Sequence, residues 1–184
     1  TAAAEANAAF GGGIYNNGSA TIINTTLAGN RARDYEGGGV LFVGGGIFSS
    51  GNKLEVEYSS FVDNLAITAG GGLAADDLER LVNNLFNRNV SFEGIADCIA
   101  PEPASPVGGE KTEYVNAPSC DTPRPPNVQL EGLTTDTDIP VYRPKVRLDK
   151  QSGSIDAAVC KLSNIQVDQL GSPRGVREKC DLGA

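Results

Sequence analysis

The chain has 184 residues, a net charge of −8 and 23 glycines, and only 6% of its residues are aromatic. This acidity opposes binding to nucleic acids and to anionic lipid surfaces, since both carry negative charge of their own. No stretch approaches the roughly 20 apolar residues of a membrane-spanning helix, and the first ten residues lack the basic and apolar regions of a signal peptide. The composition suits a structure built from many small β layers.

A glycine-rich motif recurs three times in the first half of the chain. Each copy has three glycines and an aliphatic residue, then an alternating stretch, then Leu or Phe, two further residues and Asn. The repeated positions are Gly11, Gly12, Gly13, Gly44, Gly45, Gly46, Gly70, Gly71 and Gly72, and Asn30, Asn64 and Asn89. Self-similarity at a period of about 25 residues is typical of a stacked solenoid. We therefore predict a parallel β-helix, with short strands about 4.8 Å apart from coil to coil.

The alternating stretches are predicted to be half-buried strands. In the second copy, Leu54, Val56 and Tyr58 would face one side, and Glu55 and Glu57 the other.

The glycines and asparagines are predicted to form the corners. Glycine allows a positive φ where a Cβ would clash. Asparagine tolerates the left-handed region, and its side chain can bond to backbone. We expect the three closing asparagines to form a structural ladder along one corner, with the closing Leu and Phe residues stacked inside.

Two irregular segments leave alternatives open. A fourth glycine triplet, at 37–39, precedes residues 40–43, which would be either an extra strand or a small insertion bulging from one coil. Residues 76–82 carry more charge and would form a helical turn or a strand, and register with the neighbouring copies favours the strand.

Three regions follow one another along the chain. Residues 1–95 are predicted to form the β-helix coils, residues 96–127 a proline-rich, disulfide-tethered loop, and residues 128–184 the last coil or coils and a C-terminal cap. A long loop in a compact domain usually needs tethering.

Four cysteines lie in the second half of a chain that has no histidine: Cys98, Cys120, Cys160 and Cys180. A zinc site would need all four thiolates at unsuitable spacings, so we expect disulfides and an oxidising compartment. Sequential pairing would close loops of about 20 residues, each stabilising by about 3 kcal/mol on the loop-entropy model. The sequence leaves the connectivity open.

The motifs resemble two bacterial families. The Gly-Gly-Gly-Ile and Phe-x-x-Asn signatures are similar to repeats of the polymorphic outer-membrane protein type. Residues 153–158, 168–175 and 180–184 resemble the close of the choice-of-anchor Q domain, although Leu170 stands where Arg is usual. The resemblance implies a right-handed β-helix, secreted or displayed on a bacterial surface, without an agreed activity. The predicted fold class is thus all-β: a right-handed single-stranded parallel β-helix with an irregular, disulfide-pinned C-terminal region.

Acidic residues on neighbouring coils are the candidates for catalysis or metal binding. Glu55 and Glu57 would project from one coil, and Asp76, Asp77 and Glu79 from the next. Polysaccharide lyases and hydrolases need converging carboxylates, and stacked acids offer oxygen ligands to calcium. We instead expect a solvated acidic face, with no catalytic residue, metal ligand or cofactor, and calcium as the one candidate ion.

The family-like ending carries three further acids, Asp156, Asp168 and Asp181. A metal or catalytic triad is the alternative, but short carboxylates near turns usually accept backbone N–H groups. We expect these three to stabilise the C-terminal cap, with Arg174 and Arg177 as candidate partners.

The chain starts partway through a repeat, and an open solenoid end exposes unpaired backbone and an apolar layer. Three alternatives stay open. In the first, residues 2–6 form a helical lid. In the second, the chain is a processed piece of a longer solenoid, and in the third, the open end docks head to tail on another subunit.

We therefore expect an extracellular or cell-surface structural or adhesive β-helix module, not an enzyme, that is a subunit or processed fragment of a larger assembly. Its expected partner is a protein or a second copy at the open end, with a surface glycan as a further candidate. The alternatives are a carbohydrate-active or glycan-binding β-helix, and an accessory subunit of a membrane complex that makes contact through the proline-rich loop.

Overall fold

The computed structural model describes residues 8–33, 41–51, 53–92, 97–100, 130–134, 141–144, 158–159, 164–174, 179–180 and 183. Within these residues the regular elements are all strands. The first coil carries β1 (Ala8–Phe10), β2 (Ile14–Asn16), β3 (Ser19–Ile23), β4 (Thr26–Ala28) and β5 (Arg31–Ala32). The second carries β6 (Leu41–Val43), β7 (Ile47–Ser49), β8 (Lys53–Glu57), β9 (Ser60–Val62) and β10 (Leu65–Ala66). The third carries β11 (Leu73–Ala75), β12 (Leu78–Val82), β13 (Leu85–Asn87) and β14 (Val90–Ser91), and β15 (Cys98–Ile99) follows.

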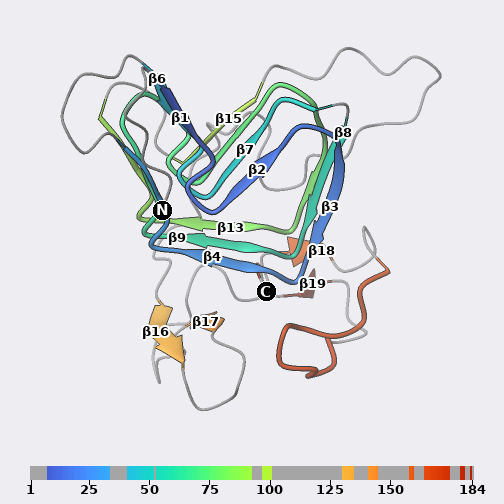
Figure 1. Ribbon diagram of the computed structural model, residues 1–184. Helices are drawn as coiled ribbons and strands as arrows, with labels where there is room; N and C mark the ends of the chain where they lie inside the picture. Colours follow the sequence, from blue (N-terminus) through green and yellow to red (C-terminus); the bar gives the residue numbers. More distant parts are fainter. Residues whose placement is uncertain are drawn as a thin grey trace.

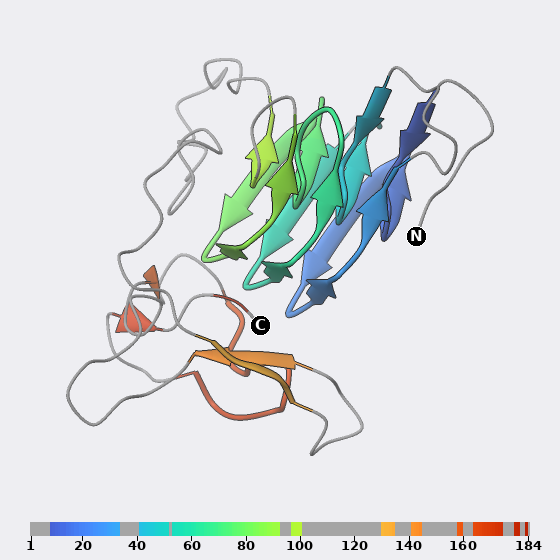
Figure 2. The same ribbon diagram turned by 90° about the vertical axis from the view of Figure 1, so that its left-hand side faces the viewer.

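Each strand lies parallel to the strand that occupies the same place in the next coil. The sheet orders are β1-β6, β15-β11-β7-β2, β12-β8-β3, β13-β9-β4 and β14-β10-β5. Figure 1 looks along this stack, and Figure 2 shows the coils side by side. The architecture is that of a parallel β-solenoid, so the all-β class and the stacking of the glycine repeats are confirmed.

The two irregular segments are both strands in this stack. Residues 41–43 form β6, which pairs with β1, so they are the regular counterpart of that strand. Residues 78–82 form β12, which pairs with β8 and has one irregularity between Leu78 and Arg80. The interval from Asn30 to Asn64 is 34 positions and that from Asn64 to Asn89 is 25. The longer interval contains residues 34–40, which lie outside the described part of the chain.

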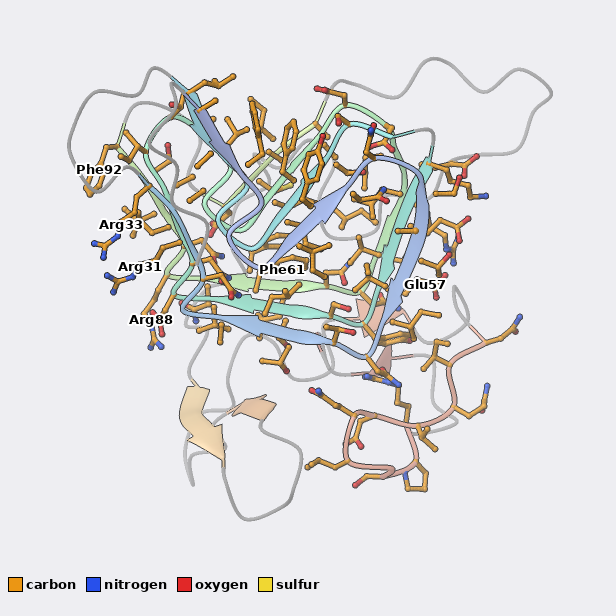
Figure 3. All side chains as sticks on the ribbon, in the orientation of Figure 1. Arg31, Arg33, Glu57, Phe61, Arg88 and Phe92 are labelled. Carbon is orange, nitrogen blue, oxygen red and sulfur yellow. The ribbon has the colours of Figure 1, made fainter. Side chains whose placement is uncertain are left out.

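The solenoid interior is a column of aligned apolar side chains. Leu27, Phe61 and Phe86 occupy equivalent positions, and the two phenylalanine rings stack with centroids 4.6 Å apart and planes 6° apart. Leu54 and Val56 are fully buried as the alternation predicts. Figure 3 shows Phe61 inside the coil. This layered packing stabilises a chain with few aromatic residues, because these two rings contact each other across adjacent coils.

The glycine triplets form a corner that no other residue fits. Gly44 has φ +68°, and a Cβ there would lie 2.7 Å from the Cβ of Phe48. A Cβ on Gly45 would overlap the carbonyl oxygen of Gly71 in the next coil. One glycine thus provides the left-handed turn and the next provides the close approach of coils.

The C-terminal region contacts the coils at the β4-β9-β13 sheet through residues 164–174 and Gly183 (Figure 1). It contains two antiparallel pairs, β16 (Leu130–Thr134) with β17 (Val141–Pro144), and β18 (Ala158–Val159) with β19 (Lys179–Cys180). The side-chain hydroxyl of Thr26 donates to Gln169 Oε1 at 2.7 Å. The side chain of Asn24 donates to the Val167 carbonyl at 2.8 Å. The sheet is therefore covered on both faces, and all three residues of β9 are buried.

Candidate functional site

The predicted asparagine positions are linked by hydrogen bonds from coil to coil. Asn30 donates its backbone N–H and its Nδ2 to Asn64 Oδ1, both at 3.0 Å. Asn64 repeats the pattern toward Asn89 Oδ1, at 3.1 and 2.9 Å. Asn64 and Asn89 also donate to the carbonyls of Leu27 and Phe61. These side chains hold the corner together and leave no polar group of Asn64 for a ligand.

The left-handed residues at this corner are the ones before the asparagines. Gly29, Asp63 and Arg88 have φ of 65°, 55° and 54°. The asparagines themselves are not among the described residues with positive φ. The expectation that Asn30, Asn64 and Asn89 use the left-handed region is therefore wrong. They are selected for their side-chain amide, which can donate and accept at once.

A second polar ladder follows the opposite corner of the β4-β9-β13 sheet. The backbone N–H of Thr25 donates to Ser59 Oγ at 3.2 Å, and that of Ser59 donates to Asn84 Oδ1 at 2.7 Å. Asn84 also donates to the Val56 carbonyl at 2.8 Å. Sequence reasoning missed this ladder. Its signal was present, since a small polar residue stands five positions before each closing asparagine.

The acidic outer face of β8 and β12 is neutralised by neighbouring cations. Lys53 Nζ lies 3.0 Å from a carboxylate oxygen of Glu55 and 2.6 Å from one of Glu79. These two hydrogen-bonded glutamates, Glu79 first, raise the pKa of Lys53. Arg80 Nε lies 2.7 Å from Glu57 Oε1, and Glu57 points away from the interior (Figure 3). The carboxylates of this face are thus held in ion pairs.

Asp76 and Asp77 diverge instead of joining the glutamates. Asp76 is exposed and lines a hollow described below. Both carboxylate oxygens of Asp77 are buried and without a hydrogen-bond partner. Among the described residues, no group of three or more Cys, Asp or Glu side chains is placed to hold a metal ion. The five candidate acids of the two coils therefore do not come together in one group.

Asp168, one of the three acids predicted to stabilise the C-terminal cap, organises a turn. Its Oδ1 accepts the backbone N–H groups of Leu170 and Ser172, both at 2.8 Å. Arg174 then reaches back to the coils, where its guanidinium lies 3.9 Å from the ring centroid of Tyr58. It donates to Asn24 Oδ1 at 2.7 Å and to the Gly183 carbonyl at 2.9 Å. Asp156, Asp181 and Arg177 lie outside the described residues, so their roles stay predictions.

Cys98 is fully buried beside Leu73 in the interior and is disulfide-bonded. Cys120 and Cys160 lie outside the described residues, and of Cys180 only the backbone is described. The connectivity therefore stays a prediction.

Three arginines gather on the outer face of β5, β10 and β14. Figure 3 shows Arg31, Arg33 and Arg88 pointing away from the coil there, with Phe92 beside them. Arg88 is paired with Asp63 through two hydrogen bonds of 2.7 Å. Arg31 and Arg33 are close in sequence, but Arg88 joins them only because its coil stacks in register with theirs.

A hollow of about 490 Å³ lies between two outer walls of the solenoid. One wall contains β1 and β6, and the other contains β7, β11 and β15, and the walls meet at the glycine corner. Of the described residues, nine apolar ones and Asp76 line it. Two of its lining rings, Phe10 and Phe48, stack with centroids 4.8 Å apart, and Tyr15 stacks on Phe48 at 5.9 Å.

The first coil leaves its apolar layer partly exposed. Its strands lie at the edge of every sheet of the solenoid. Ile14, Ala20 and Ile22 are only partly buried against the core. Their partners in the second coil, Ile47, Leu54 and Val56, are fully buried.

No family model, curated protein or solved structure matches the chain. The resemblances in the repeats and in the ending therefore remain expectations. No helix among the described residues is long and apolar enough to cross a membrane.

Proposed function

We propose that the protein is an extracellular, non-enzymatic β-helix that is right-handed, single-stranded and pinned by disulfides. It serves as a structural and adhesive module of a bacterial surface assembly. The module associates through its first coil, and the covering partner is a coil of a second copy. The observation that carries the proposal is the partly exposed apolar layer of Ile14, Ala20 and Ile22.

A second copy suits this layer because the two ends of the stack are alike. At the far end Phe86 and Ala100 are also partly buried apolar residues that pack on the same core. Strands of one coil stack on those of another at about 4.8 Å, whichever chain supplies them. Contact between two different ends is heterologous, so it would build head-to-tail rows of copies.

The ion pairs of the acidic face support a non-enzymatic role. A glycosidase needs one free acid and one free base or nucleophile at a defined separation. Glu55, Glu57 and Glu79 are instead engaged with Lys53 and Arg80. No observation favours the carbohydrate-active alternative over this proposal, and the contact surface of the membrane-complex alternative lies outside the described residues.

The test is the mass of the protein in solution across a range of concentrations, measured by light scattering. We expect association that grows with concentration. Ile22→Lys places a charge in the exposed layer and should return the protein to monomers. The matched control is Ile23→Lys, on the adjacent outer face, where the side chain is 39% exposed. It should associate like the unchanged protein.

A protein that stays monomeric at every concentration would refute the assembly. If Ile22→Lys and Ile23→Lys weakened association equally, the contact would lie elsewhere. Circular dichroism checks that both variants keep their strands. The protein would be shown to be an enzyme if it released products from acidic polysaccharides and if Glu55→Ala or Asp77→Ala abolished that release.

A further inference from the structure

The outer side of the sheet formed by β5, β10 and β14 joins a cation to exposed apolar side chains. Arg31, Leu65 and Val90 are register partners on the three strands. In the next position of two of these strands, Ala32 and Ala66 are completely buried. Because side chains alternate along a strand, Arg31, Leu65 and Val90 point outward as one row that crosses the sheet.

A second outward row lies two positions further along each strand. The backbone N–H of Phe92 donates to the Ile67 carbonyl at 3.0 Å, so the ladder continues past the strand ends. By the same alternation Arg33, Ile67 and Phe92 are neighbours on the outer side. Figure 3 shows both arginines and Phe92 there, all directed away from the coil. We call the two rows together the arginine face: Arg31, Arg33, Leu65, Ile67, Val90 and Phe92.

The arginine face has a charged side and an apolar side. Arg31 on β5 is exposed, and so are Val90 at 40% and Phe92 at 70%. Phe92 has the most exposed of the large apolar side chains in the described part of the chain. The strands β5 and β14 lie two strand spacings apart, about 9.6 Å. Positive charge and apolar surface therefore meet within one patch, and arginine and aromatic residues are the types enriched where proteins bind one another.

The residues that this face presents favour a partner protein over a sugar polymer. Guanidinium groups bind carboxylates through paired hydrogen bonds. Arg88 on the neighbouring corner shows this geometry, since it binds Asp63 through two hydrogen bonds of 2.7 Å. The aliphatic and aromatic side chains of the face suit other apolar side chains, whereas sugar hydroxyls placed against them would lose hydrogen bonds to water. A segment with acidic side chains next to apolar ones matches both sides.

We propose that the arginine face docks an acidic, amphipathic segment of a partner protein, with a carboxylate at Arg31 and apolar side chains on Val90 and Phe92. The inference goes beyond the self-association above and does not rest on it. The arginine face lies on the outer wall of the coils, whereas the apolar layer of the first coil opens at the end of the stack.

The probe is a synthetic peptide with two glutamates and two leucines at alternate positions, separated by serines. It is passed over sparsely immobilised full chain, where the copies are held apart, and surface plasmon resonance reads the binding. We expect saturable binding that weakens as salt is raised. A peptide with lysines in place of the glutamates should bind at least fivefold more weakly, and so should one with serines in place of the leucines.

Four variants test the position of the peptide. Arg31→Glu repels the carboxylate and should weaken binding more than Arg31→Ala, which removes an exposed ion pair and should weaken it up to about fivefold. Phe92→Ala should weaken binding more than fivefold, as expected for an aromatic anchor. The matched controls should leave binding unchanged: Lys53→Ala removes a positive charge from β8, and Tyr15→Ala removes a ring that is 55% exposed on another wall. Circular dichroism checks that every variant keeps its strands.

Several results would overturn the proposal. These are equal binding of the glutamate and lysine peptides, unchanged binding after both Arg31→Glu and Phe92→Ala, or equal losses in the two control variants. Displacement of the peptide by a uronic-acid polysaccharide, with undiminished binding of the peptide that lacks leucine, would identify a glycan site instead.

Discussion

The asparagine ladder predicts a large loss of stability when its central member is removed. Asn64 is completely buried. Its Nδ2 donates to the Leu27 carbonyl at 2.8 Å and to Asn89 Oδ1 at 2.9 Å. Its Oδ1 accepts the backbone N–H and the Nδ2 of Asn30. Every polar position of the amide is used, so a side chain without the amide leaves several groups unpaired at once.

Asn64→Ala deprives the Leu27 carbonyl and the Asn30 backbone N–H of these partners. A buried group that loses its hydrogen bond costs about 1–3 kcal/mol, so the pair costs about 2–6 kcal/mol. This is a large share of the roughly 5–15 kcal/mol that stabilises a typical domain. Asn30→Ala, at the end of the same ladder, removes one side-chain hydrogen bond to Asn64 and should cost about 1 kcal/mol.

Urea unfolding followed by circular dichroism measures both variants. We expect Asn64→Ala to lower the midpoint by about 1 M or more with an unchanged slope, and Asn30→Ala to lower it far less. Asn64→Asp has the same shape but turns an acceptor toward the Leu27 carbonyl and Asn89 Oδ1, and should be at least as damaging as alanine. Equal losses for Asn64→Ala and Asn30→Ala, or a tolerated Asn64→Asp, would refute the reasoning.

Two further predictions concern the contact between the coils and the C-terminal segment. Arg174→Ala removes the cation–π contact and three hydrogen bonds and should cost about 2–4 kcal/mol, seen as faster proteolysis of the segment. Arg88→Ala breaks an exposed ion pair and should cost less than about 1 kcal/mol. Equal protease sensitivity of the two variants would contradict this. Burial raises the pKa of Tyr58 above its usual 10.0. The neutral phenol is thus favoured in the folded state, so this stabilisation is complete below pH 10 and is lost as pH rises through the higher folded pKa. Tyr58→Phe should shift the alkaline unfolding transition upward, and an identical transition in both proteins would contradict the assignment.

Much of the coil structure could be predicted because each element of the repeat acts on its own neighbourhood. A glycine triplet in each copy permits the corner, and the alternation of Leu54, Glu55 and Val56 assigns one face to the interior. The prediction was wrong about which residue takes the left-handed conformation. Asn64 resembles a turn residue in sequence, but its buried amide is needed for bonds to two other coils, and Asp63 makes the turn instead.

The surface chemistry could not be predicted, because it depends on residues that the sequence separates. Glu57 and Arg80 are adjacent only after β12 stacks on β8. Tyr58 continues the buried alternation, yet its ring faces Arg174 from the far end of the chain.

The sequence by itself determined the stacked parallel coils, since a repeat of glycine corners and alternating strands has one way to bury its apolar residues coil upon coil. Only the tertiary structure decided where that stack is covered and where it is open. The ion pairs, the C-terminal contact and the hollow between the outer walls all depend on which side chains of different coils share one layer. That placement follows from the register of whole strands and not from any single copy of the motif.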